Sequence, residues 1–264
     1  MERLQKVIAS AGLASRRRAE DFVRAGQVRV NGQVVRKMGT KVDPYQDDIW
    51  VNGRRIGPPR KQVFILLHKP LGYITTRKDP QGRPTVMDLV KEVAPAVYPV
   101  GRLDQFSTGL VLLTNDGEVA YVLTHPRYQV QKVYHVWTQH AVPQADQRKL
   151  RKGIRLADGM ARAVQVRSLP KDPTGLELVL TEGRKHQIRR MLAALGHRVT
   201  RLMRTAIGPL HIGTLAPGQW RYLNPQEIQQ LRDFVREREL KVLPDKPATM
   251  KPHRVTRPAP PFRT

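Results

Sequence analysis

An α+β protein, in which helices and strands are mixed along one chain, is the fold class that we expect from this sequence. Short apolar runs bounded by turn residues, such as 63–67 and 110–113, are typical of strands. Apolar residues at helical spacing predict helices near both ends of the chain. A chain of 264 residues can bury one sizeable core and one small additional domain.

The first 57 residues predict a small module of helices followed by short strands. Apolar residues at helical spacing from Leu4 predict one helix, and Ser15 is a suitable N-cap for a second. Asn31-Gly32 is a strong turn signal between two short strands, and a further strand is expected at 48–51.

Three arginines, Arg16 to Arg18, crowd the first turn of the second predicted helix, where they repel one another and oppose the helix dipole. A negatively charged partner would relieve that repulsion; the alternative is that they only keep the surface solvated. The order of helix, Ser-Arg-Arg-x-Ala-Glu helix and Val-x-Val-Asn-Gly hairpin resembles the small alpha-L RNA-binding motif of ribosomal proteins over residues 2–50. The resemblance implies RNA phosphate contacts, which would dock RNA without reading its sequence, at Arg16, Arg17, Arg29 and Lys37.

We expect the main domain at residues 63–239, after a linker at 58–62 that its prolines stiffen. Hydrophobic periodicity and turn residues predict its elements. They are strands at 63–67, 110–113, 131–137 and 176–180, helices at 118–124, 182–196 and 224–239, a hairpin at 153–159, and a strand and turn within 199–210. Residues 240–264 are rich in proline and basic residues and poor in apolar ones, which predicts a mobile tail.

Residues 101–117, Gly-Arg-Leu-Asp-Gln-Phe-Ser-Thr-Gly-Leu-Val-Leu-Leu-Thr-Asn-Asp-Gly, are the stretch around which the main domain is organised. The run 110–113 is apolar at every position and indicates a strand buried on both faces. Gly109 breaks the segment just before that strand. Asp104 then lies in the loop that enters a core strand, where a rigid frame can hold a reactive group. Taken alone, Asp104 could equally cap a turn and pair with Arg102.

The charge of the chain narrows the class of partner. A formal net charge of +25 and a sequence pI near 11.1 attract polyanions and speed their capture. Nucleic acid is the first expectation and an anionic membrane surface the second. No apolar run approaches the roughly 20 residues that a membrane-spanning helix needs, and no secretory signal is visible at the N-terminus. We therefore expect a cytoplasmic protein without a membrane partner.

The sequence contains no cysteine, which excludes disulfides and thiolate metal sites. Its eight histidines show no metal-ligand spacing, so no metal is expected. No glycine-rich phosphate loop of the nucleotide-binding kinds occurs either. A cofactor-free enzyme and a plain binding protein both remain open.

Four segments in order resemble the pseudouridine synthases of the RsuA/RluB type, which act on ribosomal RNA. Residues 101–117 match the catalytic segment of that family, Lys-Val-Tyr-His-Val at 132–136 matches its Lys-x-Tyr-x-Val strand, and 182–191 match its third motif. His-Lys-Pro-Leu-Gly-Tyr at 68–73 resembles the first motif, with His68 in place of the usual Asn. We expect this segment to be structural first, with Pro70 and Gly72 shaping a turn and Tyr73 packing. The resemblance implies a pseudouridine synthase fold with a largely antiparallel sheet and a cleft across it.

The resemblance also implies the roles of individual residues. Asp104 matches the indispensable catalytic residue of the family, and Arg189 is the residue expected to pair with it. A guanidinium nearby favours the charged carboxylate, and arginine keeps its own charge over the working pH range. Tyr134 is expected to stack on the target base, although on the sequence alone it would be a packing residue. Arg102 is expected to help hold the flipped nucleotide and its phosphate, and Ile188 to line an apolar wall.

The basic residues around the third motif, which would form one solvated face that contacts RNA phosphates, are Arg184, Lys185 and Arg190.

The expected reaction detaches uracil from C1′ of a uridine, turns it and rejoins it through C5. No atoms are gained or lost, so we expect no cofactor. The substrate implied is ribosomal RNA or a pre-ribosomal particle, with the large subunit preferred over the small, and the enzyme is expected to be a monomer. The sequence leaves open whether Asp104 attacks C6 or C1′ or deprotonates C2′.

Two other functions stay open from the sequence. One is a ribosome-assembly factor that uses the same fold and charge only to bind RNA. The other is an Asp-dependent hydrolase of nucleic acid, which would need a second acid or metal carboxylates near Asp104. Asp116 is the one nearby candidate, and we assign it to a turn.

Overall fold

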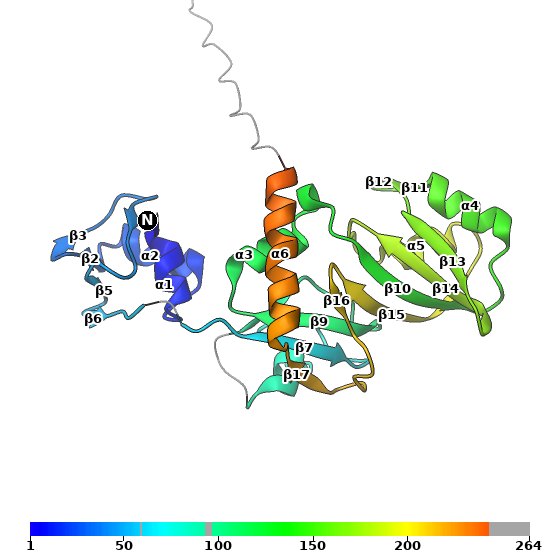
Figure 1. Cartoon of the computed structure of the whole chain (residues 1–264), viewed down its shortest axis with the longest axis horizontal. Coiled ribbons are helices and arrows are strands. Elements are labelled where there is room, and N and C mark those ends of the chain that lie inside the picture. Colours follow the sequence, from blue (N-terminus) through cyan, green and yellow to red (C-terminus); the bar gives the residue numbers. More distant parts are fainter. Residues whose placement is uncertain (59, 93–96, 243–264) are drawn as a thin grey trace, which may run out of the picture.

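The computed structural model describes residues 1–58, 60–92 and 97–242 (Figure 1). A basic module (blue in Figure 1) lies at one end of the molecule, and a large sheet with its helices forms the rest. Most of the expected tail, residues 243–264, lies outside the described residues.

The module folds as the sequence predicts. Its elements are β1 (Glu2–Arg3), α1 (Leu4–Ser10), α2 (Arg16–Arg24), β2 (Val28–Val30), β3 (Gln33–Val34), β4 (Lys41–Val42), β5 (Ile49–Val51) and β6 (Arg54–Arg55). The Ser15 hydroxyl caps α2 by accepting a hydrogen bond from the Arg18 amide at 3.2 Å. Asn31 and Gly32 both have positive φ, the conformation that a tight hairpin turn requires. The helices and strands share one apolar core, which includes Leu4, Ile8 and Val28.

Contacts hold the segment between the module and the sheet from both sides. On the module side, the Arg60 amide donates to the Ser10 carbonyl at 3.2 Å, and Arg60 Nε donates to the Ala11 carbonyl at 3.1 Å. On the other side, Gln62 Nε2 donates to the Asp116 carboxylate at 2.7 Å. These bonds restrain the position of the module relative to the sheet.

A nine-stranded sheet forms the framework of the rest of the chain. Its strands are β7 (Phe64–Lys69), β8 (Tyr98–Val100), β9 (Thr108–Thr114), β10 (Lys132–Thr138), β13 (Gln165–Leu169), β14 (Asp172–Leu180), β15 (Val199–Ile207), β16 (Leu210–His211) and β17 (Trp220–Tyr222). Their order is β13-β14-β10-β15-β9-β7-β17, with β16 beside β15 and β8 beside β9. The β9–β15 pair is parallel and the other pairs are antiparallel, so the expected largely antiparallel sheet is confirmed.

Helices and a small hairpin complete the fold. They are η1 (Val86–Val90), α3 (Gly117–Thr124), η2 (Pro126–Tyr128), α4 (Gln144–Lys152), β11 (Ile154–Leu156), β12 (Gly159–Ala161), α5 (Gln187–Ala193) and α6 (Pro225–Lys241). Helices α3 and α6 lie side by side in the middle of the molecule, whereas α4 and α5 lie at the end of the sheet formed by β13, β14 and β10 (Figure 1). Asn224 and Glu227 form the capping box expected at the start of α6.

Strand β9 is buried on both faces, as its unbroken apolar run predicts. Leu110 and Leu112 belong to the apolar cluster under α3 and α6. Val111 and Leu113 point the other way, into the cluster that also contains residues of α4 and α5. The strand therefore anchors the loop before it, which carries Asp104, to both halves of the core.

Gly109 lies inside β9 and does not break it, which corrects the expectation from the sequence. Its φ is +109°, and a Cβ atom at this position would lie 2.2 Å from the Arg204 carbonyl oxygen. The parallel pairing of β9 with β15 places Gly109 opposite Arg204. A glycine is therefore needed because the two strand backbones approach closely here.

The other differences from the expected elements have local causes. The helix expected from residue 182 begins only at Gln187, since His186 has a φ of +51° and the Gln187 side chain accepts a hydrogen bond from the Arg184 amide. Helix α4, with the sequence Gln-Ala-Asp-Gln-Arg-Lys-Leu-Arg-Lys, was not predicted because it carries too few apolar residues to show a periodic pattern.

A candidate active site at the sheet centre

A cleft of about 500 Å³ opens above the β10, β15 and β9 strands at the centre of the sheet. Four parts of the chain line it: the loop before β9, Thr124 and Pro126 at and just after the end of α3, the segment from the end of β14 to the start of α5, and the strand pair β10–β15. The predicted residues that line this cleft are Arg102, Asp104, Tyr134, Arg184, Lys185 and Ile188.

Asp104 lies on the loop between β8 and β9, and its side chain is 34% exposed to the cleft and solvent. Among the described residues, the side chain that lies within ion-pair distance of it is His186, whose Nε2 is 3.6 Å from Asp104 Oδ1. His186 is the residue before α5 and adopts the left-handed conformation. The 182–186 loop thus brings an imidazole to the carboxylate, a contact that the sequence did not predict.

The side chain of Lys69 holds the backbone of the Asp104 loop. This side chain is completely buried, and its Nζ donates hydrogen bonds to the carbonyls of Pro70 at 3.0 Å, Gln105 at 3.3 Å and Ser107 at 2.7 Å. Burial lowers the pKa of Lys69 to about 8, and the negative charge of Asp104 opposes that shift. The first motif therefore does the structural work expected of it, through its lysine as well as its turn residues.

Arg189 does not form the expected ion pair with Asp104, and no such pair occurs among the side chains that the structure describes. Its guanidinium instead donates to the Phe106 carbonyl at 2.7 Å and to the Val199 carbonyl at 3.2 Å. Two guanidinium nitrogens of Arg189 are therefore bonded to backbone carbonyls and not to the Asp104 carboxylate. Arg189 supports the Asp104 loop, and His186 takes the place beside the carboxylate.

Tyr134 and Ile188 form apolar walls of the cleft. Tyr134, on β10, is 9% exposed, and Ile188, in the first turn of α5, is 4% exposed. Arg102 is exposed on the cleft rim, two residues before Asp104. The structure thus brings Arg102, Tyr134 and Ile188 together around Asp104, as the sequence predicted.

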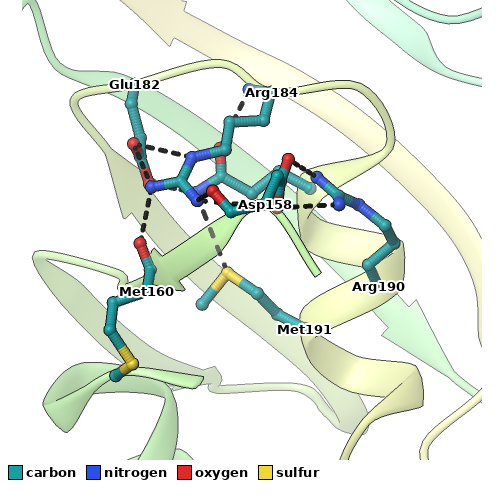
Figure 2. A network of polar contacts seen from close by, with 7 residues as sticks. Asp158, Met160, Glu182, Arg184, Arg190 and Met191 are labelled. Carbon is teal, nitrogen blue, oxygen red and sulfur yellow. Dashed lines mark hydrogen bonds and ion pairs between the residues drawn. The ribbon is translucent and has the colours of Figure 1, made fainter. Parts of the chain in front are cut away.

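Arg184 and Arg190 belong to a network of ion pairs and hydrogen bonds within the chain (Figure 2), and both side chains stay partly exposed, so their contact with RNA remains a prediction. Arg190 donates to both carboxylate oxygens of Asp158 at 2.9 Å, and Arg184 binds Glu182 at 3.0 Å and the Met160 carbonyl. Asp158 lies in the turn between β11 and β12, so the network fastens that turn to α5 and to the loop before it. Lys185 is exposed.

Two cations of the cleft, one partly buried and one fully buried, were not singled out from the sequence. Lys132 begins β10, and Arg204 lies on β15 with an exposed fraction of 2%. Lys132 is the first residue of the Lys-x-Tyr-x-Val segment, so this motif was the signal by which it could have been found. Nothing in the sequence indicated that Arg204 would reach the same cleft, because its neighbours are set by the pairing of β15 with β10 and β9.

The predicted RNA-contact residues of the module, Arg16, Arg17, Arg29 and Lys37, are all exposed. Arg16 also lines a second cavity, of about 910 Å³, between the module and α3. Gly101 and Thr124 line both this cavity and the central cleft. The two cavities therefore share part of their lining.

Within the described part of the chain, no group of three or more His, Asp or Glu side chains could hold a metal ion. Asp116 caps α3, accepting hydrogen bonds from the amides of Glu118 and Val119, which is the turn role expected for it. A search of the described helices finds none with the length and apolar character to span a membrane.

Comparison with known families defines the class of protein. A family model described as RNA pseudouridylate synthase matches residues 63–194, and one described as the S4 domain matches residues 2–49. The chain belongs to the RNA pseudouridylate synthase family and carries an N-terminal S4 domain. It is an isomerase that forms pseudouridine in RNA.

Individual relatives cover nearly the whole chain. A protein of Aquifex aeolicus named as an uncharacterized RNA pseudouridine synthase is 45% identical over 232 residues, which are 87% of this chain and 93% of that protein. Ribosomal large subunit pseudouridine synthase B of Bacillus subtilis is 43% identical over 236 residues, 88% of this chain and 96% of that protein. A crystal structure described as a pseudouridylate synthase superposes with a TM-score of 0.62 at 30% identity, covering 88% of this chain and all of that one.

Proposed function

We propose that this protein converts a specific uridine of ribosomal RNA, in the large subunit, to pseudouridine, with Asp104 as the catalytic residue. The observation that carries the proposal is the position of Asp104. It lies at the wall of a cleft that Tyr134 and Ile188 also line, on a loop whose backbone the buried Lys69 holds by hydrogen bonds. The choice of substrate is supported by the similarity to the Bacillus subtilis protein named as a large-subunit enzyme.

The proposed reaction breaks the bond between C1′ and N1 of the uridine and forms one between C1′ and C5. The proton lost from C5 is balanced by one gained at N1, so the product is an isomer. Asp104 is the carboxylate that the reaction needs, acting as nucleophile or as the base that deprotonates the sugar. His186 Nε2 lies 3.6 Å from Asp104 Oδ1, beside the carboxylate but beyond hydrogen-bond distance.

The target base must leave its stack to enter the cleft. Extrusion costs a few kcal/mol, which favours a uridine in a loop or bulge. In this proposal Tyr134 stacks on the base, an interaction that contributes about 1–3 kcal/mol. Ile188 closes the apolar wall, and Arg102 at the rim holds the phosphate of the flipped nucleotide.

The S4 domain provides the second RNA contact in this proposal. Arg16, Arg17, Arg29 and Lys37 dock RNA through its phosphates. Arg16 lines the cavity beside α3, which shares Gly101 and Thr124 with the cleft. Lys185 is the exposed cation near the cleft that is free to join them, since Arg184 and Arg190 are bound to Asp158 and Glu182.

The proposal is tested by mapping pseudouridine in ribosomal RNA from cells that lack the protein. We expect one large-subunit position to lose pseudouridine, wild type to restore it, and Asp104→Asn to leave it unmodified, because the amide cannot act as nucleophile or base. Asn is nearly isosteric, so RNA affinity should stay within about twofold of wild type.

A ribosome-assembly factor without catalysis makes the opposite prediction. In that case the deletion strain keeps every pseudouridine, and Asp104→Asn rescues every defect of that strain as well as wild type does. Either result would remove the enzymatic proposal for this chain, and loss at a small-subunit position would correct the substrate alone.

A further inference from the structure

Arg204 is a buried cation with an unused hydrogen-bond donor in the wall of the cleft. Its Nε donates to the Leu110 carbonyl at 2.9 Å, whereas its Nη2 is buried and has no hydrogen-bond partner. An unpaired buried donor on a charged group costs free energy, so such groups are normally satisfied. The unsatisfied guanidinium indicates that an acceptor is supplied from outside the chain.

A second cation lies beside it. Lys132 also lines the cleft, and the only side-chain hydrogen bond that it makes to a described residue runs from Nζ to the Val130 carbonyl at 2.9 Å. Burial and then the positive charge of Arg204 lower the pKa of Lys132 to about 8. No carboxylate of the described residues lies within ion-pair distance of either side chain, so the two charges are uncompensated.

The carboxylates that line the same cleft are already engaged or distant. Glu182 binds Arg184 and accepts a hydrogen bond from Gln187. Asp104 faces His186. The wall formed by Lys132 and Arg204 therefore keeps a net positive charge that an anionic ligand can neutralise.

Strand register places this pair next to the residue that we expect to hold the base. Arg204 on β15 is the cross-strand partner of Tyr134 on β10, and Lys132 precedes Tyr134 by two residues, so all three belong to one face of the sheet. A base stacked on Tyr134 is joined through its ribose to phosphates on either side. One of those phosphates can reach the two cations while the base stays in the cleft.

We propose that Lys132 and Arg204 form a binding site for one phosphodiester group of the RNA strand that enters the cleft. The site rests on the proposed function, since it takes the phosphate next to the target uridine. It positions the nucleotide: with the base on Tyr134 and the backbone held at this wall, C1′ is fixed relative to Asp104. Neither residue touches the atoms that react.

The test uses the full-length protein and an RNA fragment that contains its target uridine. Lys132→Met is the main variant because Lys132 is only partly buried, whereas a change at Arg204 also removes the bond to Leu110. We expect RNA affinity to fall about tenfold and the slope of log affinity against log salt to shrink by about one, as for the loss of one phosphate contact. Lys132→Arg should restore most of both. Lys171→Met, an exposed lysine in the β13–β14 turn, is the matched control and should match wild type.

A neutral backbone linkage identifies the phosphate. RNAs that carry one methylphosphonate at each position around the target are compared with the native strand. At one linkage the replacement should weaken binding to wild type and change nothing for Lys132→Met, because the variant has already lost that contact. A structural role for Lys132 would give no linkage with this pattern, and would leave the salt slope unchanged.

The outcomes separate the two proposals. If wild type forms pseudouridine while Lys132→Met keeps the wild-type salt slope and shows no coupled linkage, the phosphate site is wrong and the enzymatic function stands. If wild type forms no pseudouridine in any ribosomal RNA, the proposed function fails, and with it the site as defined here.

Discussion

At the scale of the residue, the chemistry of the cleft depends on how the Asp104 loop is held. Lys69 Nζ donates hydrogen bonds to three backbone carbonyls, one in the turn after β7 and two in the Asp104 loop. Arg189 donates to a fourth carbonyl, that of Phe106 in the same loop. The Thr75 hydroxyl adds bonds to the amide and carbonyl of Leu103. Side chains from separate elements thus fix the backbone on which Asp104 is carried, so that the carboxylate itself stays available.

The charge of Lys69 gives a pH dependence of stability. Its pKa is about 8 in the folded protein and about 10.4 in the unfolded chain. Between these values the unfolded state binds more protons, so the cost of burying this charge falls as the pH rises from 8 toward 10 and the folded state becomes more favourable. The difference in unfolding free energy between wild type and Lys69→Met should grow over this interval, by at most about 1.4 kcal/mol per pH unit.

Denaturant unfolding at several pH values measures that difference. Lys69→Met should be the less stable protein throughout, by about 2–5 kcal/mol, since it leaves buried carbonyls without a donor. Lys171→Met serves as the exposed control and should show no such trend. A difference that stays constant or shrinks above pH 8 would contradict the lowered pKa of Lys69.

Gly109 provides a second residue-scale prediction. Gly109→Ala introduces a Cβ that meets the Arg204 carbonyl oxygen at 2.2 Å, on a backbone with a φ of +109°. Strain and overlap together should destabilise the protein by about 3–5 kcal/mol. Gly218→Ala shares the positive φ, +85°, but has no atom within 4 Å of the added Cβ, so it should lose about 1–2 kcal/mol. Thermal unfolding of both variants gives the comparison, and equal losses would show that the strand contact imposes no steric demand.

At the scale of the element, the sequence predicted the strands and helices that show a strong hydrophobic period. Strand β9 was predicted because its run is apolar at every position, and the S4 helices because of their spacing and the Ser15 cap. Helix α4 was missed because only Leu150 and Gln147 of its side chains are buried. The first residues of the helix expected from 182 form a loop instead, since hydrogen bonds to Glu182 and Gln187 replace helical ones.

The site residues that belong to a sequence motif could be predicted. Those that reach the site only through tertiary contacts could not. Asp104, Tyr134 and Ile188 meet in one cleft, as the resemblance implied. The contact of His186 with Asp104 depends on the positive φ of His186, and the position of Arg204 depends on a strand pair that joins residues far apart in the sequence. Neither has a local signal.

The polar network of Figure 2 leads to a prediction for the loop before α5. Asp158→Asn removes the charge that holds Arg190 and Arg184, so residues 183–187 should exchange their amide hydrogens faster and kcat/KM should fall several-fold, because this loop lines the cleft. The loss of stability should stay below about 1 kcal/mol, since the pair is partly exposed.

Hydrogen exchange and steady-state kinetics measure these two effects. Asp172→Asn is the matched control, because Asp172 binds Thr174 within the β13–β14 turn, away from the cleft. It should change the stability to a similar extent and leave kcat/KM at the wild-type value. Unchanged exchange at 183–187 in Asp158→Asn would mean that the network does not hold the loop.

At the scale of the whole molecule, charge is distributed over two RNA-facing parts. The net charge of +25 attracts RNA at long range, and Arg16 of α2 lines the cavity beside α3. Arg16→Ala with Arg17→Ala should weaken binding of different RNAs alike and reduce the salt slope by about 1.5–2, because phosphate contacts carry no sequence information.

Binding measured at several salt concentrations tests this expectation. Arg24→Ala lies on the same helix, but Arg24 pairs with Asp21 and Glu20, so its loss should change the slope much less. A double variant that discriminates between RNA sequences, or binds with the wild-type slope, would exclude these arginines as phosphate contacts.

The parallel pair of β9 and β15 also governs when the enzyme can become active. It joins Gly109 to Arg204, so Asp104 and the far wall of its cleft become neighbours only after synthesis has passed residue 204. Pairing between such distant segments makes folding slow compared with that of a protein built from local contacts. A nascent chain released before β15 is complete therefore carries every residue of the Asp104 loop and still lacks the β15 wall of the cleft.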